Sequence, residues 1–370
     1  MMVGKTWDVA VVGAGPAGST AARDLARRGI DVLVLEKCTL PRLKPCAGGL
    51  TPKAYRLLDF DLGPVVRARA RTVELQARHH GRFTLTAPRA EIWMADRTQL
   101  DCLLAEEARR AGAHCHEGEP LLGLRLGSAV TLETARATYR ARAVVGADGA
   151  DSVVARLVGL RPRRESRYAL ALELEAEPAG PGLGDTAIVD FGLPHGYFWA
   201  FPKGDRCNVG VSAFRFDRDA FRGLRHQLDR MLAKHGLSFP SSPRLHGHKL
   251  PIWSGREPLD AGPVLLAGDA AGLVDPLFGE GIAFALRSGQ LAADAIAARL
   301  SGKVESLDGY TRTVHATLGR DLDAMGKLAA LVYWSPSLAL GVLRAVRPFQ
   351  TIAAQVISGE RNLSKAWKRG

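Results

Sequence analysis

The stretch that decides the fold is residues 7–36, WDVAVVGAGPAGSTAARDLARRGIDVLVLE. An apolar run at residues 7–12 suits a strand buried on both faces, and the glycine-rich turn GAGPAG follows it directly. Small residues and good helix formers then continue to Arg28, and Gly29 ends that helix. A second buried strand at residues 31–35 leads to Glu36. This strand, helix and strand order makes the GxGxxG match a specific prediction of a dinucleotide-binding unit.

Each residue of this fingerprint has a physical role. Gly13 permits the tight turn, Gly15 lets backbone amides approach a pyrophosphate, and Gly18 allows close packing of helix on strand. Glu36 can accept hydrogen bonds from ribose hydroxyls and would repel a 2′-phosphate, which favours FAD or NAD over NADP. The fingerprint occurs once. The site therefore holds either NAD, with direct reduction of the substrate, or FAD, with a transient reductant.

Two later segments select FAD. Residues 143–156, AVVGADGADSVVAR, read as a buried strand, a turn at Asp148 and Gly149, and a short helix. Residues 265–282, LLAGDAAGLVDPLFGEGI, read as a strand, then Gly268 and Asp269, then a glycine turn that opens a helix. With the first fingerprint, these segments resemble the three FAD motifs of the p-hydroxybenzoate-hydroxylase-like flavoproteins.

The resemblance implies roles for single residues. Asp269 is expected to accept a hydrogen bond from the ribityl chain, and the amides of residues 279–282 to face the pyrimidine end of the flavin. Asp148 and Gly149 are expected near the pyrophosphate. Arg97, in MADRTQLD, matches an arginine that opens a helix beside the flavin; the alternative is an ordinary surface arginine. The predicted cofactor-binding residues are Gly13, Gly15, Ala17, Gly18, Glu36, Lys37, Cys46, Ala47, Gly48, Arg97, Asp148, Gly149, Gly268, Asp269, Gly279, Gly281 and Ile282.

The intervening blocks are rich in strand patterns. Residues 72–86 and 168–177 read as strands, and residues 197–214 read as two strands around a Lys-Gly-Asp turn. We therefore predict an α/β protein in which a Rossmann-like FAD-binding domain is interleaved with an antiparallel-sheet substrate domain. The predicted FAD-binding domain comprises residues 1–60, 96–160 and 261–300, the substrate domain residues 61–95 and 161–260, and a C-terminal helical segment residues 301–370.

Two motifs narrow the family. Residues 40–50, LPRLKPCAGGL, resemble the PxxKxCGG motif of the geranylgeranyl reductases, flavoenzymes that saturate isoprenoid double bonds. Ala47 replaces the first glycine, which disfavours a positive φ there. Residues 196–202, GYFWAFP, resemble the aromatic strand G-Y-x-W-x-F-P of the same enzymes and depart twice from the halogenase signature G-W-x-W-x-I-P. Tyr197 and Trp199 share one face of that strand.

The resemblance implies the reaction. Saturating an isolated alkene requires a hydride from reduced flavin and a proton. Cys46 donates that proton, shapes the pocket around an ordered water, or is inert. Lys44 and Arg42 would favour the thiolate. The predicted catalytic residues are Cys46, Lys44, Tyr197 and Trp199. The predicted reductant is NADPH or another reduced carrier, and the substrate a prenyl chain on a lipid, quinone or diphosphate. Two alternatives stay open: an FAD-dependent monooxygenase or halogenase, and a flavin-binding electron-transfer protein.

Composition adds limits on partners. Lys and Arg number 50 against 38 Asp and Glu, a net charge of +12 that suggests an anionic partner such as a nucleotide or a phospholipid surface, or reflects an arginine-rich composition. No basic run is interleaved with aromatics, so we expect no nucleic acid. Five scattered cysteines and two His-rich triplets lack the spacing of a disulfide framework or zinc site, so no metal is predicted.

The C-terminal segment bears on localisation. Its apolar stripe is expected to pack on the rest of the molecule, and it also suits a lid or a membrane-surface contact. The longest uncharged apolar run, residues 328–343, is interrupted by Ser-Pro-Ser and is too short to span a bilayer. The first motif begins too early to leave room for a signal peptide. We expect a cytoplasmic protein that can also bind peripherally to the inner face of the membrane. Its oligomeric state is left open. Nearby basic residues are Arg344, Arg347, Arg361, Lys365, Lys368 and Arg369.

Overall fold

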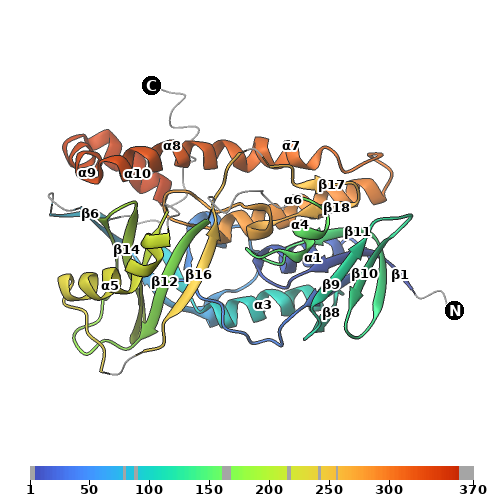
Figure 1. Ribbon diagram of the computed structural model, residues 1–370, viewed down its shortest axis with the longest axis horizontal. Helices are drawn as coiled ribbons and strands as arrows, with labels where there is room; N and C mark the ends of the chain where they lie inside the picture. The colour runs from blue at the N-terminus through green and yellow to red at the C-terminus, as the bar shows by residue number, and fades with distance from the viewer. Residues whose placement is uncertain are drawn as a thin grey trace.

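Two sheets occupy opposite ends of an elongated molecule, with helices running along its length between them (Figure 1). The computed structural model describes residues 5–77, 81–86, 91–160, 168–214, 218–240, 243–255 and 257–357. Helices and strands combine in the mixed α/β arrangement that the sequence predicts, with the C-terminal helices covering one side (Figure 1).

The first sheet is built around β1 (Thr6–Val12), which pairs in parallel with β2 (Val32–Glu36) and β11 (Thr138–Gly146). Valines and leucines of β1 and β2 are almost fully buried, which confirms strands covered on both faces. Helices α1 (Pro16–Ala26), α3 (Arg97–Arg110) and α6 (Ile282–Leu300) pack together beside it. The strand order is β17-β18-β11-β1-β2-β8, and β10 and β9 branch from β11; these have the bounds β8 (His114–Glu117), β9 (Leu121–Arg125), β10 (Val130–Thr134), β17 (Asp260–Ala261) and β18 (Val264–Leu266).

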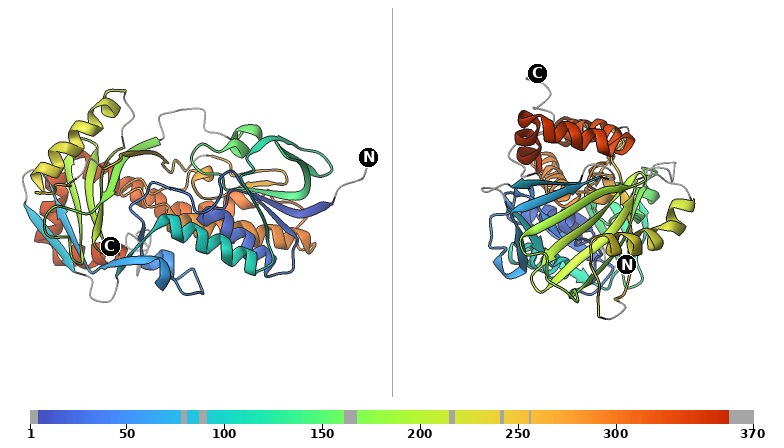
Figure 2. Two further views of the ribbon diagram at one scale, coloured as in Figure 1. Left: turned by 90° about the horizontal axis from the view of Figure 1, so that it is seen from below. Right: turned by 90° about the vertical axis from the view of Figure 1, so that its left-hand side faces the viewer.

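The second sheet has the order β16-β12-β15-β14-β13-β5-β6 and lies at the other end of the molecule (Figure 2). Its strands are β5 (Thr72–Gln76), β6 (Arg82–Thr86), β12 (Tyr168–Ala176), β13 (Thr186–Leu193), β14 (Gly196–Lys203), β15 (Arg206–Ala213) and β16 (His246–Pro251). All neighbours are antiparallel except β13 and β5, which pair in parallel. The prediction of an antiparallel sheet therefore fails at that one junction, because β5 and β13 are far apart in sequence and no hairpin dictates their direction.

Alternation along the second sheet gives it two different faces. Helix α5 (Arg218–Lys234) covers one face, where Leu228 packs with Phe198 and Val209. The opposite face carries Tyr197 and Trp199 and looks into the molecule. A small sheet in the order β3-β7-β4 joins the two ends, formed by β3 (Gly49–Leu50), β4 (Val66–Ala70) and β7 (Ile92–Ala95).

The C-terminal helices close the inner face of the second sheet. They are α7 (Tyr310–Val314), a π-helical turn at His315–Gly319, α8 (Arg320–Trp334), α9 (Pro336–Ala345) and α10 (Arg347–Ile357). Their buried residues Met325, Leu340 and Val356 pack in one cluster with Tyr197 and Trp199. Within the described ranges, no single helix has the length and apolarity to cross a bilayer; the pair Tyr310–Trp334 and Pro336–Ala345 meets that test jointly, but is bent by 108°.

Candidate active site

A cavity of about 590 Å³ lies between the two sheets, within the size range of small-molecule sites. Its lining comes from the loops after β1, β2 and β11, the inner face of the second sheet, and the C-terminal helices through Met325 and Val356. The structure brings together every predicted site residue except Gly18: Gly13, Gly15, Ala17, Glu36, Lys37, Lys44, Cys46, Ala47, Gly48, Arg97, Asp148, Gly149, Tyr197, Trp199, Gly268, Asp269, Gly279, Gly281 and Ile282 all line it.

The glycines of the first turn are required by close approach of backbone atoms. Gly13 has a φ of +99°, and a Cβ there would lie 2.4 Å from the carbonyl oxygen of Ala147. A Cβ on Gly18 would lie 1.9 Å from the Gly13 oxygen, so Gly18 packs helix on strand without reaching the cavity. Gly15, by contrast, would meet only the Arg42 side chain, at 3.7 Å. Its backbone is therefore open to a ligand at the N-terminus of α1.

Glu36 and Asp148 are held by backbone donors. The Glu36 carboxylate accepts from the amides of Ala14 at 2.8 Å and Cys38 at 3.0 Å. The Asp148 carboxylate accepts from the amides of Val153 at 2.6 Å and Val154 at 3.1 Å, which caps α4 (Val153–Leu157). These bonds fix both acids at the rim of the cavity.

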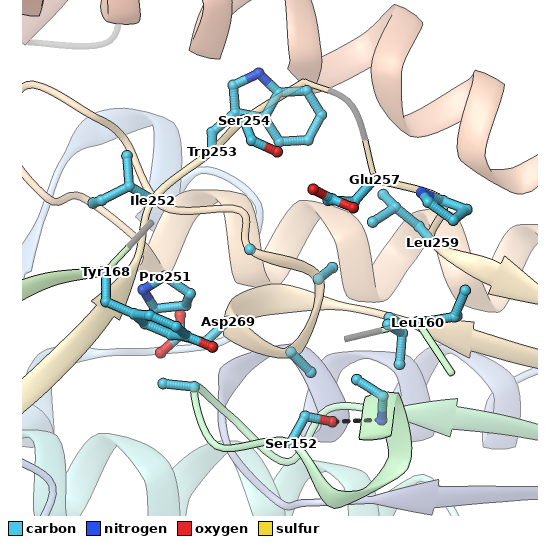
Figure 3. Close-up of a pocket in the computed structure, with 17 residues that line it drawn as sticks. Ser152, Leu160, Tyr168, Pro251, Ile252, Trp253, Ser254, Glu257, Leu259 and Asp269 are labelled. Atoms are coloured by element: carbon cyan, nitrogen blue, oxygen red, sulfur yellow. Dashed lines mark hydrogen bonds between the residues drawn. The ribbon is translucent and has the colours of Figure 1, made fainter. Parts of the chain in front are cut away.

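Asp269 stands between the large cavity and a smaller one of about 40 Å³. Figure 3 shows the smaller cavity, around which Tyr168, Trp253 and Glu257 lie with Asp269. The hydroxyl of Ser152 on its far side accepts a hydrogen bond from the Ala155 amide at 2.9 Å (Figure 3). Asp269 therefore borders both spaces.

The glycine turn before α6 presents a helix N-terminus to the cavity. Asp275 accepts from the amides of Leu277 at 2.8 Å and Phe278 at 3.1 Å and holds this turn. Gly279 has a φ of +69°, and Gly279, Gly281 and Ile282 line the cavity where α6 begins. The positive end of the helix dipole favours negative charge at that place, as expected for the flavin's pyrimidine end.

Arg97 opens α3 as predicted, yet it is buried. It is 7% exposed and makes two hydrogen bonds to Asp101, from Nε at 3.0 Å and Nη2 at 3.1 Å. Burial opposes its charge, but Asp101 outweighs burial and raises the pKa of Arg97. Its guanidinium also faces the thiol of Cys46. The surface alternative for Arg97 is therefore wrong, and a permanent cation lies beside Cys46.

The cysteine loop needs no positive φ at Ala47. The left-handed position is Gly48, with a φ of +74°, where a Cβ would lie 2.1 Å from the Ala95 oxygen. Ala47 packs instead against the apolar cluster of the second sheet. The amide of Gly48 lies 3.4 Å from Cys46 Sγ and donates to it. The departure from the motif at Ala47 therefore leaves the loop unstrained.

The neighbours of Arg42 and Lys44 could not be read from the sequence. Arg42 lies 3.6 Å from Glu36 and 3.1 Å from Asp101. Lys44 Nζ contacts the imidazole of His248. Burial lowers the pKa of Lys44, and burial together with Lys44 lowers the pKa of His248 to about 4, so this imidazole is neutral at pH 7. No role is predicted from the sequence for His248, which belongs to one of the two His-rich triplets, although its alternation with Leu250 on β16 would have placed it on the inner face.

Tyr197 and Trp199 form an aromatic wall opposite the nucleotide loops. The indole Nε1 of Trp199 donates to Asn208 at 2.8 Å, and the Tyr197 hydroxyl donates to the Phe278 carbonyl. The indole lies over Gly210, where a Cβ would lie 2.3 Å from its Cζ2 atom. Both polar groups are satisfied, so the rings present apolar surface to the cavity.

Glu173 is the acidic residue that sequence reasoning missed. It lies on β12, lines the cavity and is 7% exposed. Burial raises its pKa to about 7, against the lowering effect of the Cys46 amide and Lys203. Among the described residues, no group of three or more His, Cys, Asp or Glu side chains could hold a metal ion.

The residues present fit FAD. An open Gly15 backbone, two helix N-termini and an acid at the end of β2 are the donor set that a dinucleotide requires. The rest of the cavity is lined largely by apolar side chains, which suits a ring system and a hydrophobic substrate.

Comparison with known proteins supports the assignment of FAD as the cofactor. Residues 6–185 match the model of the FAD binding domain family. The chain is 33% identical to a menaquinone reductase of Mycobacterium tuberculosis over 81% of its length and 78% of that protein. It is also 33% identical, with the same coverage, to a geranylgeranyl diphosphate reductase of Rhodobacter capsulatus.

Solved structures share the fold. A geranylgeranyl bacteriochlorophyll reductase-like protein of Thermoplasma acidophilum superposes with a TM-score of 0.78 at 24% identity, covering 95% of this chain and 99% of that one. The flavin-dependent halogenase CmlS superposes with a TM-score of 0.72 at 23% identity, covering 95% and 72%. These likenesses concern the fold alone. Motifs, cavity and relatives together establish that the chain belongs to the geranylgeranyl reductase family of FAD-dependent oxidoreductases.

Proposed function

We propose that this protein saturates carbon–carbon double bonds of an isoprenoid chain carried on a lipid, quinone or diphosphate. The observation that carries the proposal is the single cavity that joins the nucleotide loops to an apolar wall formed by Tyr197, Trp199 and Phe201. The names of the relatives, a menaquinone reductase and a geranylgeranyl diphosphate reductase, support this substrate class.

Reduced FAD, when bound, supplies the hydride. The chain's own residues divide the remaining tasks. Tyr197 and Trp199 hold an apolar chain and exclude water, since their polar groups are already satisfied. Cys46 holds a proton on Sγ at the border between the nucleotide loops and the aromatic wall. NADPH or another reduced carrier would deliver electrons near Asp148 and Gly149, where a Cβ on Gly149 would meet nothing within 4 Å.

The decisive experiment is anaerobic. The purified FAD-loaded protein is photoreduced and mixed with geranylgeranyl diphosphate, menaquinone or a geranylgeranylated phospholipid, and flavin absorbance and product mass are followed. The expected result is reoxidation of the flavin together with a product heavier by two hydrogens per double bond. A fully saturated analogue serves as control. Reoxidation that requires oxygen, with oxygen or halogen in the product, would overturn the proposal in favour of a monooxygenase or halogenase.

Substitution of Cys46 separates its two possible roles. If the thiol donates the proton, Cys46→Ser slows alkene reduction by about 10²-fold while FAD stays bound. Full alkene reduction by Cys46→Ser would remove the donor role and leave Cys46 with a role in pocket shape. The Cys102→Ser variant is the matched control, because Cys102 is on α3 and outside the cavity lining.

The outer face of the C-terminal helices supports peripheral contact with an anionic bilayer. Its exposed apolar residues are Leu331, Trp334, Leu338, Val342, Val346 and Phe349. Residues 324–357 contain three basic residues and no acidic ones, which complements anionic lipid. The inner face of the same helices lines the cavity through Met325 and Val356, so a bilayer-borne chain would reach the site over a short path.

Vesicle sedimentation tests this contact. We expect binding to phosphatidylglycerol vesicles that is weaker on phosphatidylcholine and weakened by salt, and lost in a Trp334→Ser, Leu338→Ser double variant. Leu122→Ser is the control, since Leu122 is also exposed but lies on β9 at the other end of the molecule. Equal binding by both variants would place the contact elsewhere.

A further inference from the structure

Alkene saturation consumes one proton for each hydride, and the site must resupply it. Four acids that line the cavity near the nucleotide loops are already committed: Glu36 and Asp148 accept backbone amides, Asp151 pairs with Lys249 at 3.1 Å and Glu280 pairs with Lys53 at 3.3 Å. A fifth, Asp269, is the acid expected to contact the ribityl chain of the flavin. Glu173 differs from these acids in its position, because it lies on the second sheet, lines the same cavity as Cys46 and faces the backbone N–H of that residue.

The backbone surroundings of Glu173 come from its own strand β12, from the neighbouring β15 and from the cysteine loop. On β12, Ala171, Glu173 and Glu175 alternate toward the inner face. Gly210, on the central strand β15, is the register partner of both Glu173 on β12 and Trp199 on β14. Glu173 and Trp199 therefore lie on the same face of the sheet, one on each flank of Gly210. The backbone N–H of Cys46 faces the carboxylate from the loop.

Among the described residues, no cation forms an ion pair with the Glu173 carboxyl. Lys203, from β14, donates to the Ala95 carbonyl at 2.9 Å and pairs with Glu175 at 3.2 Å. His246, from β16, is the register partner of Glu173. Tyr197 and Cys46 are the remaining titratable neighbours. The surroundings of Glu173 thus stabilise its carboxylate only weakly, and burial favours the neutral carboxylic acid.

We propose that Glu173 holds the proton that restores the Cys46 thiol after each reduction, a role that rests on the proposed function. In this step the Sγ–H bond of Cys46 breaks as its proton joins one alkene carbon, while the hydride from reduced flavin joins the other. The resulting thiolate takes a proton from the Glu173 carboxylic acid, which then takes one from solvent. The balance is one alkene, one hydride and one proton for each saturated bond. Glu173 is here a positioning residue, because it acts through Cys46.

The location of Glu173 suits this resupply. Its neighbour Glu175 lies two residues further along β12 on the same face, and Glu175 is about one-third exposed. In the proposal, protons reach Glu173 from solvent along this polar end of the strand, away from the aromatic wall. At neutral pH the acid and its conjugate base are both populated, since burial raises the pKa of Glu173 to about 7.

The first test needs no substrate. Alkylation of Cys46 by iodoacetamide is followed on the FAD-loaded protein from about pH 5 to about pH 9 by mass spectrometry of the Cys46 peptide. In the native protein, ionisation of Glu173 disfavours the thiolate, so the rate profile has a second inflection near pH 7. Glu173→Gln removes that inflection, and Glu175→Gln, on the same strand and face, keeps it. Superimposable profiles for Glu173→Gln and the native protein would overturn the proposal, whatever the substrate is.

The second test measures alkene reduction over many turnovers, with the bound flavin kept reduced by excess dithionite, so that Cys46 must regain its proton each time. The native rate falls as pH rises above about 7, and Glu173→Gln is about 10²-fold slower and loses this pH dependence. Glu173→Asp restores part of the rate. A native protein that reduces no alkene would refute the proposed function while the alkylation result still stands.

A measurement on the native chain covers the case in which Glu173→Gln does not retain FAD. Infrared spectra of protein carrying isotope-labelled glutamate should contain a protonated carboxyl band that disappears as pH rises through about 7. The label separates this band from that of Asp275, whose pKa burial raises to about 6. Absence of a labelled band below that pH would also overturn the proposal.

Discussion

The two walls of the cavity are built from different materials. The wall on the first sheet is made of glycines and backbone amides, and its acids Glu36 and Asp148 are tied to that backbone. The wall on the second sheet is made of side chains, chiefly Tyr197, Trp199 and Glu173. The first wall suits a ligand recognised through backbone geometry, and the second can change its ligand by changing side chains without altering the strands. On the proposed function, the chain would separate cofactor binding from substrate choice.

The largest effect tests whether a buried charge supports the first wall. Asp101 is 0% exposed and receives hydrogen bonds from Arg97, with Arg42 at 3.1 Å. Asp101→Ala leaves the buried Arg97 cation without its carboxylate and leaves Arg42 with Glu36 alone, so we expect a loss of about 4 kcal/mol in unfolding free energy and loss of bound FAD. Denaturant titration and flavin absorbance measure both.

The matched control has the same spacing on the surface. Asp229 pairs with Arg225 at 3.1 Å on α5, also four residues apart, and both side chains are more than half exposed. Asp229→Ala should cost about 0.5 kcal/mol or less. Equal losses of unfolding free energy in the two variants would show that burial of the Arg97–Asp101 pair does not increase its contribution to stability.

A second prediction concerns the fit of helix on strand in the first wall. Gly18→Ala would place its Cβ 1.9 Å from the Gly13 oxygen, so the backbone must move. We expect the unfolding free energy to fall by about 3 kcal/mol and FAD binding to weaken. Thermal unfolding and flavin release measure the two effects. Gly180→Ala, where a Cβ meets nothing within 4 Å, should leave both unchanged. An unaffected Gly18→Ala variant would contradict the close approach.

On the second wall, stability should depend on pH through Glu173. Its pKa is about 7 in the folded protein against a usual value of 4.5, so between these pH values the folded state binds a proton that the unfolded state has lost. The unfolding free energy therefore falls as pH rises across this window, by about 2 to 3 kcal/mol relative to Glu173→Gln. Denaturant titrations at several pH values measure the difference. Parallel curves for the two proteins would refute it.

The smallest effect separates the walls most cleanly. Trp199→Phe removes the indole donor and leaves the buried Asn208 oxygen unpaired, at a cost of about 1 to 2 kcal/mol. Prenyl substrate binding should weaken while FAD occupancy stays the same. Trp334→Phe, at a side chain that is 76% exposed, should change neither. Loss of FAD from Trp199→Phe would mean that the walls are not independent.

The first wall is also the one that the sequence predicts best. Gly13 and Gly18 are needed because a Cβ at either position would lie within 2.4 Å of a backbone oxygen, and only glycine has no Cβ. The starts of α3 at Arg97 and α6 at Ile282 agree with the motifs that predicted them. Steric necessity of this kind leaves a residue-level signature.

The second wall could be predicted only in outline. Alternation identifies strands and a shared face for Tyr197 and Trp199, but it carries no record of which distant strand is the neighbour, so the parallel pairing of β5 with β13 was missed. The same limit hid Glu173. The alternation of a strand predicts that a single acidic residue faces solvent. Only the structure shows that other elements cover the face on which Glu173 lies.

The pairing of β5 with β13 also constrains how the protein is made. A ribosome releases β5 long before β13, so the growing chain carries an unpaired strand edge that is open to wrong partners. Among the described residues, Val356 is the last in chain order that lines the cavity, so the lining is incomplete until that residue has been made. Capture of the flavin in the full pocket therefore has to follow synthesis of the C-terminal helices, long after the glycine turn of the first wall has been made.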